Sequence, residues 1–328
     1  PDRTIRWGMI GCGAVTERKS GPAFYQAKGS AISVVCARTL ASAQCYAQRH
    51  GVGIAVDNLD TLIRQEQVDA VSLATPPDSH CPLALQVAAA GKPCCVEKPM
   101  ALSNAECSRM VDAFAKARQP LFVSYYRRSL PRFNQVKAWL DSGTIGTLRQ
   151  VHWQFCKAAS ALDRTGVYNW RTDSTIAPGG YFDDLASHGI DLLQYLLGDI
   201  DSVVGLSNNQ QHLYPAMDAV AAIWRHRDSL LGQGIVGSGN WNFGADGRRD
   251  WVEITGDKGH IRFAIFADAP VVLINRDGRT ERFIINPDPI QLPHVDNMLA
   301  HLRGQASHPS SGVTASKTSW AIERILHF

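Results

Sequence analysis

The sequence predicts an α/β fold, with a doubly wound parallel sheet first and an α+β domain after it. Two observations carry this prediction. In residues 1–125, short β-rich runs alternate with longer helical patterns, whereas after Tyr125 most strands are joined by tight turns. At about 150 residues per domain, a chain of 328 residues also suggests two domains. We therefore expect a first domain over residues 1–125 and a second over residues 126–328.

The first domain is expected to contain five buried strands with five helices between them. The strands are Ile5–Ile10, Ile32–Ala37, Asp69–Ala74, Cys94–Val96 and Leu121–Ser124. The helices are Thr16–Lys28, Leu40–His50, Asn58–Gln67, Ser79–Ala90 and Ser103–Arg118. This alternation is typical of a parallel sheet with right-handed crossovers and helices on both faces. The alternative, that the short runs are fragments of buried helices, is disfavoured because the pattern repeats.

The second domain is expected to begin with a helix, Leu130–Leu140, and a strand, Thr147–Cys156. A loop ending in Pro178-Gly179-Gly180 then leads into a strong helix, Phe182–Leu197. Later strands are expected at Met217–Arg225, Leu230–Asn240, Asp250–Thr255, His260–Phe266, Val271–Asn275 and Glu281–Asn286, and closing helices at His294–Arg303 and Ala315–His327. Arg276-Asp277-Gly278-Arg279 has the composition of a hairpin turn. Strands joined by hairpins favour an antiparallel sheet.

Composition and charge exclude several classes of protein. Hydrophobic residues make up 45% of the chain and charged residues 19%, which is an ordinary globular balance. No apolar run approaches the roughly 18 residues of a membrane-spanning helix. The 33 basic and 30 acidic residues give a net charge of +3 without long runs of one sign. We therefore expect neither a membrane nor a nucleic-acid partner, because nucleic acid requires a clustered basic patch.

The eight cysteines indicate a reducing compartment, which we take to be the cytoplasm. All lie in the first half of the chain, and no C-x-x-C pair occurs. Several lie in apolar runs, where a free thiol packs as a small hydrophobe. No zinc or iron–sulfur ligand set is present, so no metal is expected. The chain starts at Pro1 rather than Met, and whether a leader was removed is left open.

A glycine-rich turn follows the first predicted strand. Gly11 and Gly13 form a G-x-G pattern between that strand and the first helix, and Thr16 stands where a third glycine is common. Gly11 permits a tight turn, and Gly13 lets the backbone approach a pyrophosphate at the start of the helix. The pattern alone is weak, but its place at the first strand–helix turn predicts dinucleotide binding.

The residues after the second strand indicate which dinucleotide is bound. An acidic residue there would bind the ribose 2′-hydroxyl of NAD, but the sequence is Arg38-Thr39, and no carboxylate occurs before Asp57. Arg38 can bind a 2′-phosphate, with a hydroxyl bond from Thr39. The alternative is an exposed arginine beside a Thr39 helix cap. NADP is therefore favoured, with NAD possible.

Two further features suggest catalytic residues. Lys98, just after the predicted strand Cys94–Val96, is expected to point into the crevice at the carboxyl ends of the strands, with its direction set by a turn at Pro99. On the helix 182–197, Asp184, His188, Asp191 and Tyr195 form one stripe, and Asp184 is placed to orient the His188 imidazole. A solvent-exposed lysine and a solvated polar face are the alternatives.

Together these residues resemble the glucose–fructose oxidoreductase, inositol dehydrogenase and MocA (Gfo/Idh/MocA) family. The resemblance rests on G-x-G-x-x-T after the first strand, Thr75-Pro76-Pro77 with His80, Glu97-Lys98-Pro99, and Asp184-x-x-x-His188-x-x-Asp191. It covers nearly the whole chain and implies a Rossmann domain followed by a domain built on a large open, mainly antiparallel sheet. One departure is that the family's run of three glycines before the catalytic helix reads Gly179-Gly180-Tyr181 here, so Tyr181 narrows that edge of the pocket.

The resemblance also implies roles for individual residues. Lys98, Asp184 and His188 form the implied catalytic set, in which His188 acts as acid/base, Asp184 as its orienter and Lys98 as a cationic hydrogen-bond donor. The residues expected around the cofactor are Gly11, Gly13, Ala14, Val15, Arg38, Thr39, Thr75, Pro76, His80, Glu97 and Lys98. Independently of the resemblance, aromatic faces mixed with hydrogen-bonding groups suit a sugar, polyol or cyclic diol. The residues expected around the substrate on this ground are Tyr126, Arg127, Tyr168, Trp170, Arg171 and Asp184, with Trp153 and Asn169 as further candidates. Trp153 is equally compatible with the core of the sheet.

The expected function is NAD(P)-dependent oxidation or reduction of a secondary alcohol or ketone in a sugar, polyol or cyclic diol. Two alternatives share the fold: a dinucleotide-binding sensor without turnover, and an enzyme that cleaves glycosidic bonds with transient use of NAD. A sensor would not need the Lys98, Asp184 and His188 set. We also expect a homodimer or homotetramer formed through the second domain's sheet, whose strands carry apolar residues on the uncovered face.

Overall fold

The computed structural model describes residues 3–327, which divide into two compact units. The first unit contains the chain up to Leu130 together with Pro287–Ser316, and the second contains Pro131–Asn286 and the chain from Lys317 onward. The first division lies five residues after the predicted boundary. Residues 287–316, which the sequence prediction placed in the second domain, pack in the first unit. No helix of the described residues is long and apolar enough to span a membrane.

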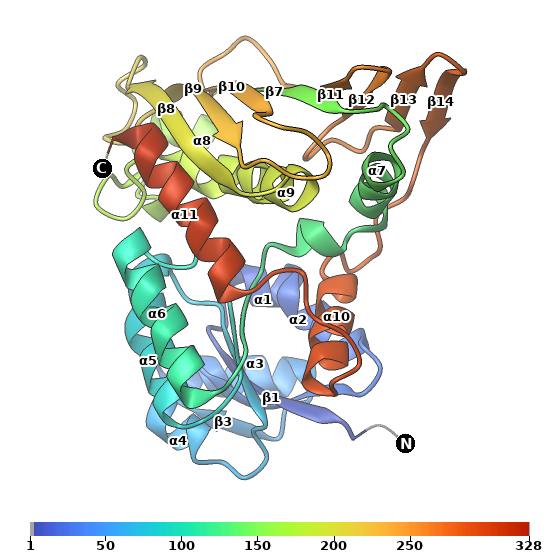
Figure 1. Cartoon of the computed structure of the whole chain (residues 1–328). Helices are drawn as coiled ribbons and strands as arrows, with labels where there is room; N and C mark the ends of the chain where they lie inside the picture. Colours follow the sequence, from blue (N-terminus) through green and yellow to red (C-terminus); the bar gives the residue numbers. More distant parts are fainter. Residues whose placement is uncertain (1–2, 328) are drawn as a thin grey trace. The chain divides into compact units, whose positions relative to one another are not determined.

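The first unit is built on a six-stranded parallel sheet in the order β3-β2-β1-β4-β5-β6 (Figure 1). The strands are β1 (Ile5–Ile10), β2 (Ser30–Cys36), β3 (Ile54–Val56), β4 (Ala70–Leu73), β5 (Cys94–Val96) and β6 (Leu121–Val123). The predicted parallel α/β class is confirmed, and five of the six strands were predicted. The prediction missed β3, an edge strand in which Ile54 and Ala55 are only partly buried, whereas the equally short β5 and β6 are fully buried.

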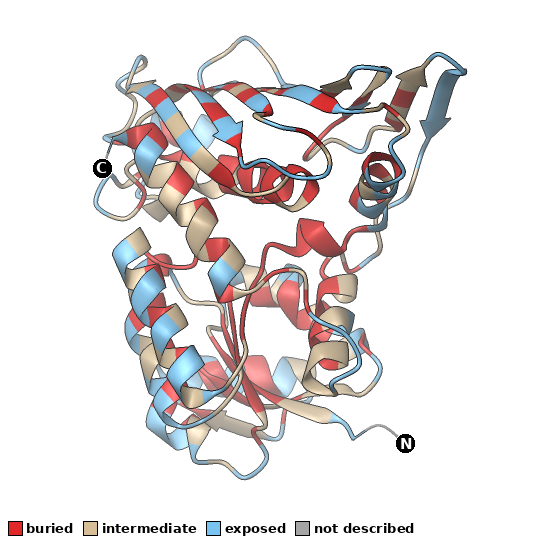
Figure 2. Cartoon of the chain, in the orientation of Figure 1, coloured by how far each residue is buried: buried red, intermediate tan, exposed pale blue. Residues whose placement is uncertain are grey.

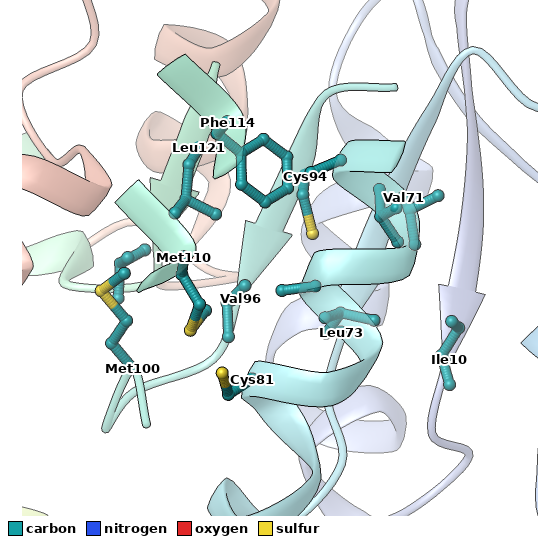
Figure 3. Close-up of a cluster of buried hydrophobic side chains, with 14 of the residues drawn as sticks. Ile10, Val71, Leu73, Cys81, Cys94, Val96, Met100, Met110, Phe114 and Leu121 are labelled. Atoms are coloured by element: carbon teal, nitrogen blue, oxygen red, sulfur yellow. The ribbon is translucent and has the colours of Figure 1, made fainter. Parts of the chain in front are cut away.

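Helices cover both faces of this sheet. They are α1 (Ala14–Arg18), α2 (Ser20–Gln26), α3 (Leu40–His50), α4 (Leu59–Ile63), α5 (His80–Ala89), α6 (Asn104–Ala117) and α10 (Leu292–Leu302). On one face α5 and α6 bury a cluster that includes Met110, Phe114 and the thiols of Cys81 and Cys94 (Figure 3). On the other face α2, α3 and α10 pack around Trp7. The single helix predicted over residues 16–28 is two helices, because the backbone leaves the helical conformation at Lys19.

The second unit is built on an eight-stranded sheet in the order β14-β13-β12-β11-β7-β10-β9-β8. The strands are β7 (Leu148–Cys156), β8 (Ile200–Asn208), β9 (Ala219–His226), β10 (Val236–Asn242), β11 (Arg249–Gly256), β12 (Gly259–Phe263), β13 (Val271–Asn275) and β14 (Gly278–Arg282). Only the β7–β10 pair is parallel, so the sheet is mainly antiparallel, as the resemblance implied.

One strand of this sheet was missed, and the bounds of two predicted strands need correction. The edge strand β8 was not predicted. The strand predicted from Leu230 begins only at Val236. The last strand is Gly278–Arg282 rather than Glu281–Asn286, because Gly278 already pairs with Asn275 across a two-residue turn.

Helix α9 (Ser187–Leu197) packs against one face of the eight-stranded sheet. A Cβ on Gly189 would lie 2.2 Å from the Trp153 ring, so the glycine lets the helix approach the sheet closely. Trp153 is fully buried and belongs to the core of the sheet, which is the alternative that the sequence left open. The remaining helices are α7 (Pro131–Asp141), α8 (Ala161–Thr165) and α11 (Gly312–Leu326), and α11 enters the second unit at Lys317.

The opposite face of this sheet leaves apolar side chains exposed. In Figure 2 the strands β8–β10 alternate between buried and exposed or intermediate residues. The exposed apolar side chains on this outward face are Val204, Leu206, Ile223, Val236 and Trp251. The register places Val204 opposite Ile223 on neighbouring strands. The sheet therefore exposes apolar side chains on the face that the oligomer prediction uses, and the assembly itself stays a prediction.

Candidate functional site

The glycine turn between β1 and α1 has the geometry that a pyrophosphate requires. Gly11 has φ of +103°, and a Cβ there would lie 2.5 Å from the carbonyl oxygen of Ala74, so only glycine fits. A Cβ on Gly13 would meet nothing within 4 Å, so the backbone borders open space. Thr16 is buried, and its hydroxyl donates to the carbonyl of Gly13 at 2.8 Å, which fixes the turn internally. These residues fit a dinucleotide, with Ala14 and Val15 in the first helical turn.

Arg38 and Thr39 follow β2 and differ in how they are held. Arg38 is exposed and has neither a hydrogen bond nor an ion pair to any residue within 3–327. The Thr39 hydroxyl accepts the backbone N–H of Ser42 at 3.2 Å and caps α3. The alternative that Thr39 acts as a helix cap is therefore confirmed. Binding of a 2′-phosphate by Arg38 stays a prediction, which its exposed guanidinium permits.

His80 joins the loops that follow β4 and β5. Its side chain is fully buried, with Nε2 at 2.8 Å from the Thr75 carbonyl and Nδ1 at 3.0 Å from the Pro99 carbonyl. Burial lowers the pKa of His80, although the backbone bonds act against this shift. Thr75 in turn accepts the hydroxyl of Ser79 at 2.6 Å, and Pro76 is exposed. His80 was predicted to bind the cofactor, and this geometry indicates that it acts by positioning the two loops.

Lys98 lies two residues after the end of β5, where the sequence placed it, and its peptide bond to Pro99 is cis. The neighbouring Glu97 accepts a hydrogen bond from the amide of Gln291 at 3.3 Å. Burial raises the pKa of Glu97, while Gln291 and Lys98 act in the opposite direction. Lys98 therefore has a half-buried carboxyl as its chain neighbour. The backbone of Lys98 is fixed on one side by the sheet and on the other by the loop that His80 holds.

The second unit holds Asp184 and His188 at the start of the predicted catalytic helix. Residues Phe182–Ala186 form a π-helical turn, and α9 follows from Ser187. The Arg171 Nε donates to the Asp184 carboxylate at 2.9 Å. His188 is buried with its ring edge-to-face against Phe266, at a centroid distance of 6.1 Å. Asp184 as the orienter of His188 stays a prediction.

The polar stripe of this helix is not a solvated face. Asp191 is 1% exposed, and its carboxylate accepts the Thr318 hydroxyl at 3.1 Å. The same hydroxyl accepts a bond from the amide of Gln194. The alternative of a solvent-exposed stripe is therefore wrong for His188 and Asp191, because α11 and neighbouring residues cover this side of the helix.

The predicted substrate residues fall in three places. Trp170 and Arg171 form a short 3-10 turn in the second unit, with the guanidinium 4.4 Å from the Trp170 ring centroid. Tyr168 is exposed and lines a pocket of about 340 Å³, together with Asn169, Asp163 and Tyr214 among others. Tyr126 and Arg127 belong to the first unit, where both are buried and the Arg127 guanidinium lies 5.0 Å from the Tyr126 ring.

Sequence reasoning missed a cluster around Tyr181. The Lys157 ammonium lies 3.8 Å from the centroid of the Tyr181 ring. The Tyr181 hydroxyl donates to Asp163, which also accepts the backbone N–H of Ser160 at 2.8 Å. Burial lowers the pKa of Lys157 and raises that of Tyr181 to about 12. The one available signal was Tyr181 itself, which stands where the resemblance expects glycine.

Within the described residues, no three His, Cys, Asp or Glu side chains are grouped to hold a metal. The catalytic candidates form two separate sets. Lys98, Glu97 and His80 lie in the first unit, and Asp184, Arg171 and His188 lie in the second.

Comparison with known proteins gives matches over both units. The model of an oxidoreductase family with an NAD-binding Rossmann fold, Gfo/Idh/MocA, matches residues 5–125, and that of the Gfo/Idh/MocA C-terminal domain matches residues 133–262. Oxidoreductase P35 of Formosa agariphila is 33% identical over 94% of each chain. Myo-inositol 2-dehydrogenase of Thermotoga maritima is 27% identical over 72% of this chain and 69% of its own length.

A solved structure is similar to this chain over nearly its whole length. The WlbA dehydrogenase of Bordetella pertussis, solved in complex with NADH and UDP-GlcNAcA, superposes with a TM-score of 0.84 at 25% identity. The superposition covers 99% of this chain and 95% of that chain.

Proposed function

Because this chain belongs to the Gfo/Idh/MocA family of NAD-binding oxidoreductases, we propose that it transfers a hydride between a nicotinamide dinucleotide and a secondary alcohol or ketone of a sugar, polyol or cyclic diol. The observation that carries the proposal is the environment of His188. A buried imidazole lies four residues from a carboxylate that is itself held by Arg171. A relative named myo-inositol 2-dehydrogenase supports the substrate class.

In the proposed reaction the protein's residues manage the proton and the developing charge. When bound, the nicotinamide accepts or returns the hydride. His188 takes the hydroxyl proton in one direction and returns it in the other, as an imidazole suits near neutral pH. Asp184 orients that imidazole. Lys98 donates a hydrogen bond to the reacting oxygen and stabilises its alkoxide character.

We propose that Gly11, Gly13, Ala14 and Val15 hold the pyrophosphate and that Thr75, Pro76 and Glu97 border the cofactor further along. NADP is the proposed cofactor, because Arg38 offers an exposed guanidinium where a carboxylate would select NAD. The family as a whole is described as NAD-binding. We add the proposal that this chain prefers the dinucleotide that carries a 2′-phosphate.

The proposal extends to assembly and to location. A second copy of the chain is proposed to cover the apolar face of the eight-stranded sheet, giving a homodimer or homotetramer. The cytoplasm is the proposed location, because Cys45 is an exposed free thiol, and such thiols persist in a reducing compartment.

Steady-state absorbance at the NAD(P)H band, with both cofactors and a panel of sugars, polyols and cyclic diols, tests the activity. We expect net formation of reduced cofactor with at least one alcohol. Dinucleotide binding without any change in absorbance would favour a sensor. Release of a free sugar from a glycoside with no net change in absorbance would favour glycoside cleavage.

A further inference from the structure

Lys157, which follows β7 directly, is a cation without an acidic partner. Its side chain is half-buried, and no hydrogen bond or ion pair joins its ammonium to the residues that the structure describes. Lys137 provides a comparison within the same unit. Its ammonium lies 5.5 Å from the Tyr195 ring centroid, and it pairs with Asp141 at 3.0 Å. Both lysines lie over a tyrosine ring, but only Lys137 has its own carboxylate.

The two carboxylates that act on Lys157 through space are engaged elsewhere. Asp163 accepts the Tyr181 hydroxyl and the backbone N–H of Ser160, and these bonds lower its pKa despite burial. Asp184 accepts the Arg171 Nε. Both influence Lys157 only through space. Even partial withdrawal of an ammonium from water is costly unless an anion compensates it, and the described residues supply none at hydrogen-bonding distance.

Arg171 and the two carboxylates that act on Lys157 already have partners of their own. Arg171 is paired with Asp184, and Asp163 accepts the Tyr181 hydroxyl. The Lys157 ammonium is therefore left to bind an external anion. One ammonium matches a singly charged anion such as a carboxylate better than a phosphate dianion.

Tyr181 fixes the position of this positive charge. Its ring is buried between Tyr214 and Phe243, at centroid distances of 6.0 and 5.7 Å, and its hydroxyl is anchored on Asp163. The ring face then attracts the Lys157 ammonium at 3.8 Å. A glycine at position 181 would remove both the ring face and the anchor, so the cation site depends on this residue.

We propose that Lys157, held on Tyr181, binds the carboxylate of an acidic sugar, so that the substrate is a sugar acid rather than a neutral sugar. This inference rests on the proposed oxidoreductase function. Tyr181, which holds Lys157, stands three residues before Asp184 in the same unit, so the proposed anion site is built on the segment that leads into the acid/base pair. The carboxylate is bound by Lys157, and the reacting hydroxyl is left to His188.

Matched substrates provide the kinetic test. Each hexuronate is compared with the hexose of the same configuration, with the preferred cofactor, in wild type and in Lys157→Met, Lys157→Arg and Lys137→Met. We expect wild type to prefer hexuronates. Lys157→Met should lower kcat/KM for hexuronates by roughly 10–100-fold, mostly through KM, and leave that for hexoses unchanged. Lys157→Arg should retain most of the preference, and Lys137→Met should behave as wild type.

Titration calorimetry with hexuronates, hexoses and hexose 6-phosphates gives a second measurement that needs no turnover. We expect wild type to bind hexuronates most tightly and Lys157→Met to lose that advantage at an unchanged melting temperature. Hexoses binding as tightly as hexuronates, or equal hexuronate affinity in Lys157→Met, would overturn the proposal, and so would tighter binding of 6-phosphates. If no compound is turned over with either cofactor, the oxidoreductase proposal fails, while calorimetry still decides the anion site.

Discussion

His188 and Asp191 lie three residues apart on one helix, yet the structure gives them different surroundings. The Asp191 carboxylate is buried and accepts a hydrogen bond from the Thr318 hydroxyl on α11, so its role is to join two helices. The His188 ring packs against the edge of Phe266 next to the turn that carries Asp184. A sequence stripe cannot separate these roles, because the periodicity shows which residues share a face and not what covers that face.

Replacing His188 tests the proposed acid/base role. His188→Ala should lower kcat by roughly 10²–10⁴, because the proton is no longer exchanged, while the affinity for the dinucleotide barely changes. Asp191→Asn is the matched variant on the same helix. It should lower the free energy of unfolding by about 1–3 kcal/mol and change kcat little. Turnover assays, cofactor titration and urea unfolding provide these values. A His188→Ala enzyme that keeps more than about a tenth of wild-type kcat would move the role to another group, with Lys98 the first candidate.

Arg38 permits an equally direct test of cofactor choice. Arg38→Asp should weaken NADP binding by about 1.5–3 kcal/mol, because a charge-assisted contact to the 2′-phosphate is lost and repulsion replaces it. Binding of NAD should be affected less, or improved. Fluorescence titration with both reduced cofactors measures the two affinities. Equal binding of NAD and NADP by wild type would contradict the argument from Arg38.

Among the elements, those with a long or regular apolar pattern were predicted best. Strands Ile5–Ile10 and Cys94–Val96 and helix Leu40–His50 have the predicted bounds. Strand β3 is as short as Cys94–Val96 but lies at the edge of the sheet, where Ile54 and Ala55 are only partly buried, so it lacks the pattern of a central strand. The edge strand β8 reads as irregular because its outward residues Val204 and Leu206 are also apolar. The π turn before α9 depends on hydrogen bonds one residue longer than in an α-helix, and no composition signal marks it.

The π turn also carries Asp183, whose environment predicts a pH dependence of stability. Burial raises its pKa to about 7, although the backbone N–H of Gly179 donates to its carboxylate at 2.8 Å. In the unfolded chain the pKa is near 3.9. Between these two values the folded state binds more protons, so stability falls as the pH rises from about 4 to 7, by about 2–4 kcal/mol.

Asp183→Asn keeps an acceptor for Gly179 but cannot ionise. Urea unfolding of wild type and variant between pH 4.5 and 8 measures the difference. We expect the variant to gain stability relative to wild type across this range, with the largest gain above pH 7. Parallel curves for the two proteins would show that Asp183 titrates normally.

At the scale of the whole chain, the order of domains was predictable but the path of the last 40 or so residues was not. The predicted helix near His294–Arg303 exists as α10, yet Val295, Met298 and Leu299 pack with Trp7 and Phe24 of the first unit. Its amphipathic pattern shows that the helix buries one face. Which sheet receives that face depends on contacts between residues nearly 300 positions apart, and a single sequence does not contain them. The same limit applies to Lys157 and Tyr181, which meet only in the folded unit.

The outward face of the eight-stranded sheet leads to the last prediction, which concerns assembly. Leu206 is 75% exposed and Ile223 is 61% exposed on neighbouring strands, with Val236 and Trp251 further along the same face. Full burial of one such side chain contributes about 1.5–3 kcal/mol, so a second copy covering this face gains a substantial free energy of association. Light scattering at micromolar concentration should therefore return at least twice the chain mass of 35.9 kDa.

Charge placed on this face should break the assembly without unfolding the unit. Ile223→Lys together with Leu206→Lys should shift the protein toward the monomer, because association would bury two unpaired ammonium groups. Leu162→Lys, at an exposed apolar position on α8 rather than on the sheet, is the matched control and should keep the wild-type mass. Both proteins should retain the wild-type circular dichroism spectrum, since none of these side chains is buried within the unit. A wild-type mass of about 36 kDa, or a double variant that still assembles, would show that this face is not the interface.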